Sequence, residues 1–89
     1  NGLDFKSREA LLSSISDLAA QPHAPTLIYV THHVEEIIPV FSHSLLIRRG
    51  NVFASGQTSQ VLNSEQLSDF FETPVEITWK NSRPWLTLL

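Results

Sequence analysis

Two adjacent histidines at the end of a short apolar run are the residues of this chain best suited to chemistry. The run is TLIYVT at residues 26–31, and it is followed by His32, His33, Glu35 and Glu36. An imidazole can donate a hydrogen bond to an anion or transfer a proton near neutral pH. In open α/β sheets, ligands bind beyond the carboxyl ends of the strands, and His32 has that position if the run is a strand. The alternative is a structural histidine that caps the strand and bonds a nearby carbonyl group.

Metal binding is a second chemistry that these residue types suggest, because histidine and glutamate are zinc ligands. Successive residues at a strand end point in opposite directions, so His32 and His33 are not expected to reach one ion. The helical metal motif places its histidines four residues apart, which is not the spacing here. We therefore predict no metal site. Glu35 and Glu36 suit a first helical turn, where carboxylates interact favourably with the helix dipole.

The first third of the sequence predicts a helix, a loop and a buried strand that lead to His32. Asp4 is a suitable helix N-cap. Two prolines in QPHAP at residues 21–25 predict a loop. The run at 26–31 is apolar and β-branched without alternation, which is typical of a strand covered on both faces in a parallel sheet. Between the cap and the loop, an apolar stripe recurs with helical period: Leu11, Leu12, Ile15, Leu18 and Ala19.

A strand covered on both faces needs parallel neighbours, and the rest of the chain does not supply them. We therefore expect a partner strand upstream in a longer protein, of which this chain is a C-terminal part; Asn1 as the first residue agrees with this. An uncovered apolar strand also favours pairing between copies. The chain by itself is expected to self-associate, to exchange elements or to be only marginally stable.

The middle of the chain predicts a strand pair followed by two short helices. The strands lie within residues 43–56, with a tight turn at Gly50 and its neighbour Asn51. Arg48 and Arg49 at this turn are expected to be solvated and not to form a phosphate site. Thr58 and Ser64 are the candidate N-caps of the two helices.

The end of the chain predicts a β-hairpin. Apolar and polar residues alternate in VEITW at 75–79 and in WLTLL at 85–89. Trp79 and Trp85 are expected to form a cross-strand aromatic pair. The complete pattern predicts an α/β fold, with a few-stranded sheet flanked by helices and with C-terminal β-hairpins.

The composition excludes several classes of function. A formal net charge of −3 over 89 residues argues against nucleic-acid binding, which usually needs a basic surface. The chain has no cysteine, so disulfides and thiolate metal sites are excluded. No apolar run approaches the roughly 20 residues of a membrane span.

Three stretches in order resemble the C-terminal part of an ABC-type ATPase, the nucleotide-binding domain or subunit of ABC transporters. They are NGLD at residues 1–4, TLIYVTHHVEEI at 26–37 and LLIRRGNVFASGQTSQVL at 45–62. The resemblance implies that residues 1–73 are the C-terminal portion of such a domain, a fragment of a P-loop NTPase fold. Residues 74–89 are then a variable extension.

The resemblance implies roles for two residues. NGLD is similar to the family's D-loop, so Asp4 is expected at the dimer contact near ATP. His32 matches the switch histidine of the H-loop, which hydrogen-bonds the γ-phosphate of ATP and helps to position the attacking water. His33 stands where the family usually has Asp, and no role is carried over to it. The Walker A, Q-loop, signature and Walker B motifs would all precede Asn1.

The resemblance also implies the cofactors and partners of the full-length protein. These are ATP and Mg²⁺, a second nucleotide-binding domain and a transmembrane permease subunit, at the cytoplasmic face of a membrane and without nucleic acid. The chain by itself is expected to be an inactive part of an ATPase, with no cofactor bound. Two alternatives stay open: a stand-alone interaction or regulatory module, and an ABC ATPase that has no role in transport.

Overall fold

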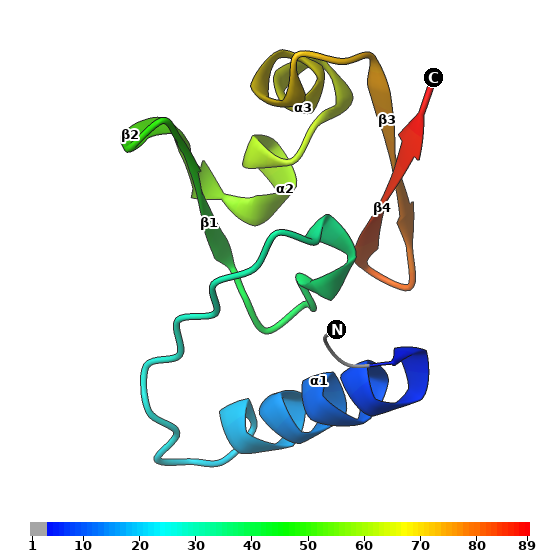
Figure 1. Ribbon diagram of the computed structural model, residues 1–89. Helices are drawn as coiled ribbons and strands as arrows, with labels where there is room; N and C mark the ends of the chain where they lie inside the picture. The colour runs from blue at the N-terminus through cyan, green and yellow to red at the C-terminus, as the bar shows by residue number, and fades with distance from the viewer. Residues whose placement is uncertain (1–3) are drawn as a thin grey trace. The chain divides into compact units, whose positions relative to one another are not determined.

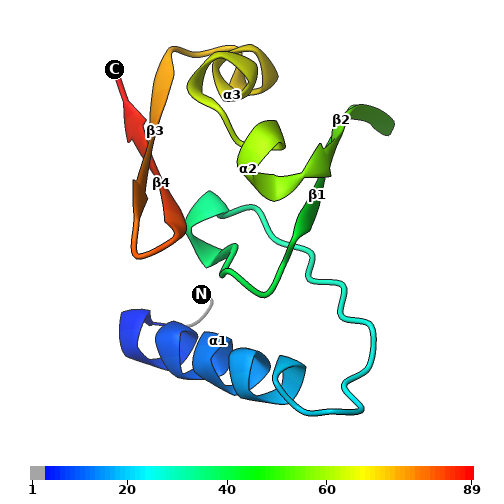
Figure 2. The same ribbon diagram turned by 180° about the vertical axis from the view of Figure 1, so that it is seen from behind.

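The computed structural model describes residues 4–89, and the chain divides into two units, Asn1–His32 and His33–Leu89. The first unit contains one helix, and the second contains two antiparallel hairpins and the short helices between them (Figures 1 and 2). The elements are α1 Phe5–Ala19, the 3₁₀ helix η1 Val34–Glu36, β1 His43–Arg48, β2 Asn51–Gln57, α2 Thr58–Val61, α3 Ser64–Phe71, β3 Val75–Lys80 and β4 Arg83–Leu88. The predicted mixture of helices and strands and the C-terminal hairpin are confirmed.

Helix α1 begins where the sequence predicted. Asp4 is its N-cap, and the carboxylate accepts a hydrogen bond of 2.8 Å from the backbone N–H of Ser7. This backbone bond, and then the Ser7 hydroxyl, hold the pKa of the Asp4 carboxyl below its ordinary value of 3.8. The predicted apolar stripe is only partly covered, because Leu12 is buried whereas Leu11 and Leu18 are 40% and 39% exposed.

The predicted strand at residues 26–31 is wrong for this chain. The segment has no strand partner among the described residues and appears in Figure 1 as an irregular trace between α1 and η1. Ile28 and Val30 are 87% and 89% exposed. A β-strand exists only where its backbone groups pair with a neighbour. The parallel neighbours that the pattern called for are absent from residues 4–89, so the segment does not form a strand.

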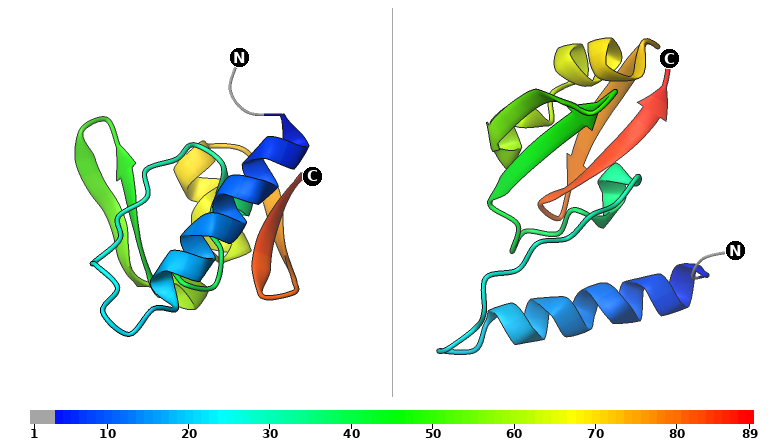
Figure 3. Two further views of the ribbon diagram at one scale, coloured as in Figure 1. Left: turned by 90° about the horizontal axis from the view of Figure 1, so that it is seen from below. Right: turned by 60° about the vertical axis from the view of Figure 1, so that its left-hand side comes forward.

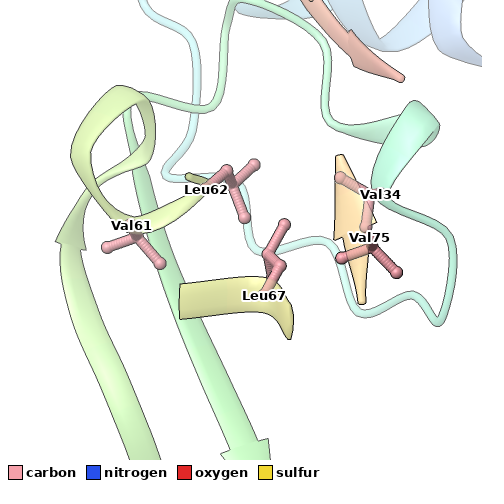
Figure 4. Close-up of a cluster of buried hydrophobic side chains, with 5 residues drawn as sticks. All are labelled: Val34, Val61, Leu62, Leu67 and Val75. Atoms are coloured by element: carbon pink, nitrogen blue, oxygen red, sulfur yellow. The ribbon is translucent and has the colours of Figure 1, made fainter. Parts of the chain in front are cut away.

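The second unit is organised around helix α3. Leu67 of α3 is fully buried and lies between Val61 of α2 and Val75 of β3 (Figure 4). Leu62 and Val34 complete the buried cluster. Half-buried apolar side chains surround it: Ile37, Leu46, Ala54, Phe70 and Ile77. Each large aliphatic side chain buried here contributes about 1.5–3 kcal/mol relative to an exposed one.

Two-residue turns close both hairpins. Arg49 and Gly50 join β1 to β2 with φ of 54° and 77°, and Asn81 and Ser82 join β3 to β4 with φ of 53° and 61°. Positive φ at both central residues is the geometry of a type I′ turn, whose twist matches that of the paired strands. The first hairpin is confirmed, but its turn lies one residue earlier than Gly50–Asn51. The right-hand view of Figure 3 shows both hairpins along their length.

Arg49 is exposed as predicted, but the prediction is wrong for Arg48, whose side chain is largely covered. Its guanidinium donates to the carbonyl oxygens of Asp69 and Phe70 at 3.0 and 3.3 Å and lies 4.6 Å from the centre of the Phe53 ring. These carbonyls belong to the last turn of α3, whose negative dipole end favours a cation. Arg48 therefore ties the first hairpin to α3.

The tryptophan pair predicted in the last hairpin is also wrong. Trp79 stands opposite Pro84, and Trp85 stands opposite Thr78. Directly opposed residues share a face of the hairpin and successive residues alternate, so the two indoles lie on opposite faces. Trp85 packs instead under the guanidinium of Arg83, whose central carbon is 5.1 Å from the ring centre.

The caps of the two short helices lie one residue before the predicted positions. Gln57 precedes α2, and Asn63 caps α3 by accepting a hydrogen bond of 2.7 Å from the N–H of Gln66. Thr58 and Ser64 are the first helical residues, so their hydroxyls are available for other bonds. The Thr58 hydroxyl donates a hydrogen bond to the Phe41 carbonyl oxygen at 2.8 Å.

Two serines of α3 satisfy the outer backbone edge of β3. The hydroxyl of Ser64 accepts from the N–H of Ile77 at 2.9 Å, and that of Ser68 accepts from the N–H of Val75 at 3.0 Å. The Ser68 hydroxyl also lies 3.1 Å from the Val75 carbonyl oxygen, to which it donates. These bonds replace a third strand and prevent the edge from pairing elsewhere.

Replacing Ser68 with alanine should destabilise the second unit. The substitution leaves the N–H of the buried Val75 without its acceptor, which costs about 1–3 kcal/mol. The free energy of unfolding, measured by urea titration, is expected to fall by that amount. The exposed Ser59→Ala variant is the matched control and should stay within about 0.5 kcal/mol of the parent chain. Equal stabilities for the two variants would contradict this role of Ser68.

The Asp4 carboxyl should titrate below 3.8 in the folded chain. Because folding lowers its pKa, the stabilisation that the carboxylate gives to α1 is present above the unfolded pKa and is lost as the pH falls through the folded pKa. Carboxyl ¹³C shifts followed against pH, in water and in concentrated urea, measure the two values. In Ser7→Pro, which removes both donors, the folded pKa is expected to return toward 3.8. An unchanged low pKa in that variant would refute the assigned cause.

Candidate functional site

His32 is exposed and lies at a bend directly after the irregular segment 26–31. It is the last residue of the first unit, and the strand that was expected to carry it is absent in this chain. Its imidazole is therefore reachable by a ligand, although no sheet edge among the described residues holds it. Accessibility is the property that a hydrogen-bond donor to a phosphate requires.

The residues after His32 form a short 3₁₀ turn that belongs to the second unit. The Glu36 N–H donates to the His33 carbonyl at 3.0 Å, and the N–H of the next residue donates to the Val34 carbonyl at the same distance. Val34 is buried in the core cluster, whereas the His33 side chain is 62% exposed and its Nδ1 lies 3.8 Å from Glu35 Oε1. An ion pair so exposed contributes little. The helical turn expected at Glu35 and Glu36 is confirmed, as η1.

Arg83 of β4 holds this turn from the other end of the unit. Its Nε donates to the Glu35 carbonyl oxygen at 3.2 Å, and its Nη2 donates to the same oxygen. The two residues are 48 positions apart. Sequence reasoning missed Arg83, because it sits next to a turn and resembles a solvated hairpin residue. No local sequence pattern identifies an arginine whose hydrogen-bond acceptor is a backbone carbonyl far away in the sequence.

Asp4 and His32 are both in the first unit, but no hydrogen bond or ion pair joins them in the described part of the chain. Asp4 is exposed, and its carboxylate serves the first turn of α1. Helix α1 has 15 residues and is therefore about 22 Å long. Asp4, predicted at the dimer contact, and His32, predicted as the phosphate donor, thus lie in separate parts of the chain. They form no common site among the described residues.

The described residues supply part of a phosphate site and not the whole. His32 offers one exposed donor. The glycines within residues 4–89 are Gly50, in a hairpin turn, and Gly56, near the end of β2, so this part of the chain contains no glycine-rich phosphate loop. Such a loop presents several backbone N–H groups to a phosphate, which a lone imidazole cannot do.

An open groove of about 630 Å³ lies in the second unit. Its lining is polar and partly acidic, with an aromatic wall: Phe53, Asn63, Glu65, Gln66 and Asp69. None of the residues expected to act on a nucleotide lines it. Among residues 4–89 there is no group of three or more histidine or carboxylate side chains placed to hold a metal ion. No helix in the same range is long and apolar enough to cross a membrane.

Sequence comparison relates the chain to transport ATPases. It is 49% identical over 86 residues to the uncharacterized ABC transporter ATP-binding protein YlmA of Bacillus subtilis strain 168, which covers 97% of this chain and 33% of that protein. It is 43% identical over 77 residues to YmeB of Lactococcus lactis, which bears the same description, covering 86% of this chain and 30% of that protein. The molybdenum import ATP-binding protein ModC of Shewanella sp. strain MR-7 is 31% identical over 86 residues, or 97% of this chain and 19% of that protein.

The chain thus spans a third or less of the length of these curated relatives. No family model matches it. The Bacillus alignment covers 86 of the 89 residues, so at most 89 − 86 = 3 residues lie outside it, and most of the last hairpin is included. On this similarity the chain belongs to the family of ABC transporter ATP-binding proteins, whose ATP-binding domain has the P-loop NTPase fold.

Proposed function

We propose that this chain is the C-terminal part of an ABC transporter ATP-binding subunit and contributes the switch histidine, His32, to ATP hydrolysis. The observation that carries the proposal is the exposed imidazole immediately after an apolar, strand-forming segment, in a chain that aligns almost completely with such subunits. The alignment favours an ATPase subunit over a stand-alone interaction module.

In the proposed mechanism, His32 donates a hydrogen bond to an oxygen of the γ-phosphate and helps to orient the attacking water. Phosphoryl transfer depends mainly on positioning and on stabilisation of developing negative charge, which one well-placed donor can supply. Mg²⁺ neutralises charge on the β- and γ-phosphates when it is bound. Among the described residues no group of three or more histidine or carboxylate side chains is placed to hold a metal ion. We assign the ligands of Mg²⁺, like the phosphate loop, to other parts of the full-length protein.

Segment 26–31 and Asp4 would complete the contribution of this chain to the site. Segment 26–31 becomes a core strand once neighbouring strands pair with it, which would cover Ile28 and Val30 and bring His32 to a sheet edge. Asp4 would then act at the contact with a second nucleotide-binding domain, as the D-loop position implies. A permease subunit is the proposed membrane partner, and the subunit acts at the cytoplasmic face of the membrane.

Replacing His32 with alanine in the full-length protein should abolish most of its ATPase activity. Loss of one donor to the transferring phosphoryl group is expected to lower kcat by about 10²–10³-fold. His23→Ala, which removes an exposed loop histidine, is the matched control and should retain activity. The 89-residue chain alone is expected to show no more turnover than its own His32→Ala variant. Full activity of His32→Ala in the full-length protein would overturn the proposal.

Segment 26–31 should make the isolated chain self-associate. It exposes Ile28 and Val30 almost completely and contains no charge that would repel a second copy. Light scattering is expected to give a mass above that of the monomer, and Val30→Lys should shift it toward the monomer. Gln60→Lys adds the same charge at an exposed site elsewhere and should leave the mass unchanged. A well-folded monomeric parent chain would contradict this expectation.

A further inference from the structure

The backbone that follows His32 is anchored by the C-terminal hairpin. Turn η1 begins two residues after His32, and its middle carbonyl, that of Glu35, accepts from both Nε and Nη2 of Arg83. The two N–H groups of one guanidinium edge converge on a single oxygen. Because the guanidinium is planar and rigid, this fork fixes the direction of the carbonyl as well as its position.

Arg83 is itself held in place by its neighbours in β4. Its guanidinium lies over the ring of Trp85, and the side chain of Pro84 between them is fully buried. Arg83 also stands opposite Lys80, at the turn end of the hairpin. An arginine whose orientation is set by stacking loses less side-chain freedom when it binds a carbonyl than a flexible lysine does.

A second anchor fixes the same turn from its other side. The side chain of Val34 is only 8% exposed and packs in the cluster that contains Val75 of β3. Both strands of the hairpin thus hold η1. Strand β3 does so through apolar packing, and β4 does so through the Arg83 guanidinium. The carbonyl of His33 accepts the Glu36 N–H within the same turn, so the peptide group between His33 and Val34 is part of the anchored structure.

We infer that Arg83 is a positioning residue for His32 in ATP hydrolysis, acting through the Glu35 carbonyl. The inference rests on the proposed function of His32. Only two residues lie between His32 and Glu35 in the chain, so anchoring the Glu35 carbonyl limits the positions that the His32 backbone can take. A displacement of about 1 Å at a reacting centre can lower the rate by about a hundredfold. The last hairpin is in this view part of the catalytic apparatus rather than a variable appendage.

The structural half of the inference can be tested in the 89-residue chain. Arg83→Ala should accelerate amide hydrogen exchange at Glu36, whose N–H closes the turn, by about tenfold or more. Lys80→Ala removes one positive charge from the same end of the hairpin and should leave this exchange unchanged. Equal protection in both variants would show that Arg83 does not hold the turn, and would overturn the inference.

The functional half needs the full-length ATP-binding protein. Arg83→Ala should lower kcat by about ten- to a hundredfold while KM for ATP stays within about twofold, because only the reacting geometry is disturbed. Arg83→Lys keeps the charge but cannot provide the two-pronged fork, so its kcat should fall between those of Ala and the parent protein. If Arg83→Ala does not fold, Arg83→Lys alone decides: parent-like kcat with a relaxed turn would refute the inference.

A double-mutant cycle separates the two proposals. In a His32→Ala background, Arg83→Ala should cause no further loss of kcat, because the group that it positions is gone. If Arg83→Ala lowers kcat by the same factor with and without His32, Arg83 acts independently and the inference fails while the function of His32 stands. If His32→Ala is itself fully active, the proposed function fails.

Discussion

The second unit depends on one apolar contact, the complete burial of Leu67 between the elements on either side of α3. The chain has two hairpins of two strands each, and a lone hairpin is marginally stable in water. Helix α3 solves this by packing against both the α2 segment and β3 with one face. The side chains that share this cluster come from four elements, so the loss of the helix would expose all of them together.

Polar groups then determine how the elements dock around that contact. Ser64 and Ser68, four residues apart on α3, face β3 and bond its backbone. Arg48 covers the last carbonyls of α3, and Arg83 covers the carbonyl of Glu35 in η1. In each case a side chain completes a backbone hydrogen bond that regular secondary structure leaves open. The two arginines act by the same chemistry at opposite hairpins, and the second of them acts on the turn beside His32.

The first unit shows the opposite situation, in which a segment suited to a sheet belongs to none. Segment 26–31 has the composition of a core strand, but it is not part of a sheet, and Ile28 and Val30 are exposed to solvent. The chain spans about a third of the length of the Bacillus relative that it matches. The residue expected to reach the nucleotide lies between this unsupported segment and a turn that the second unit holds firmly.

Sequence by itself determined the features that depend on neighbours along the chain. These features follow from residues a few positions apart: the cap at Asp4, α1, the two hairpins, the helical turn at Glu35 and Glu36, and the family resemblance around His32. Only the tertiary structure decided the features that depend on partners distant in the sequence. Segment 26–31 is not a strand, because pairing requires another strand. Arg48 and Arg83 are anchors, because their acceptors lie more than 20 residues away in the sequence. Trp79 and Trp85 lie on opposite faces, because the register of the hairpin was set by its two-residue turn. A local sequence pattern limits the roles that a residue can have. Contacts with residues distant in the sequence determine which of these roles it has in the folded chain.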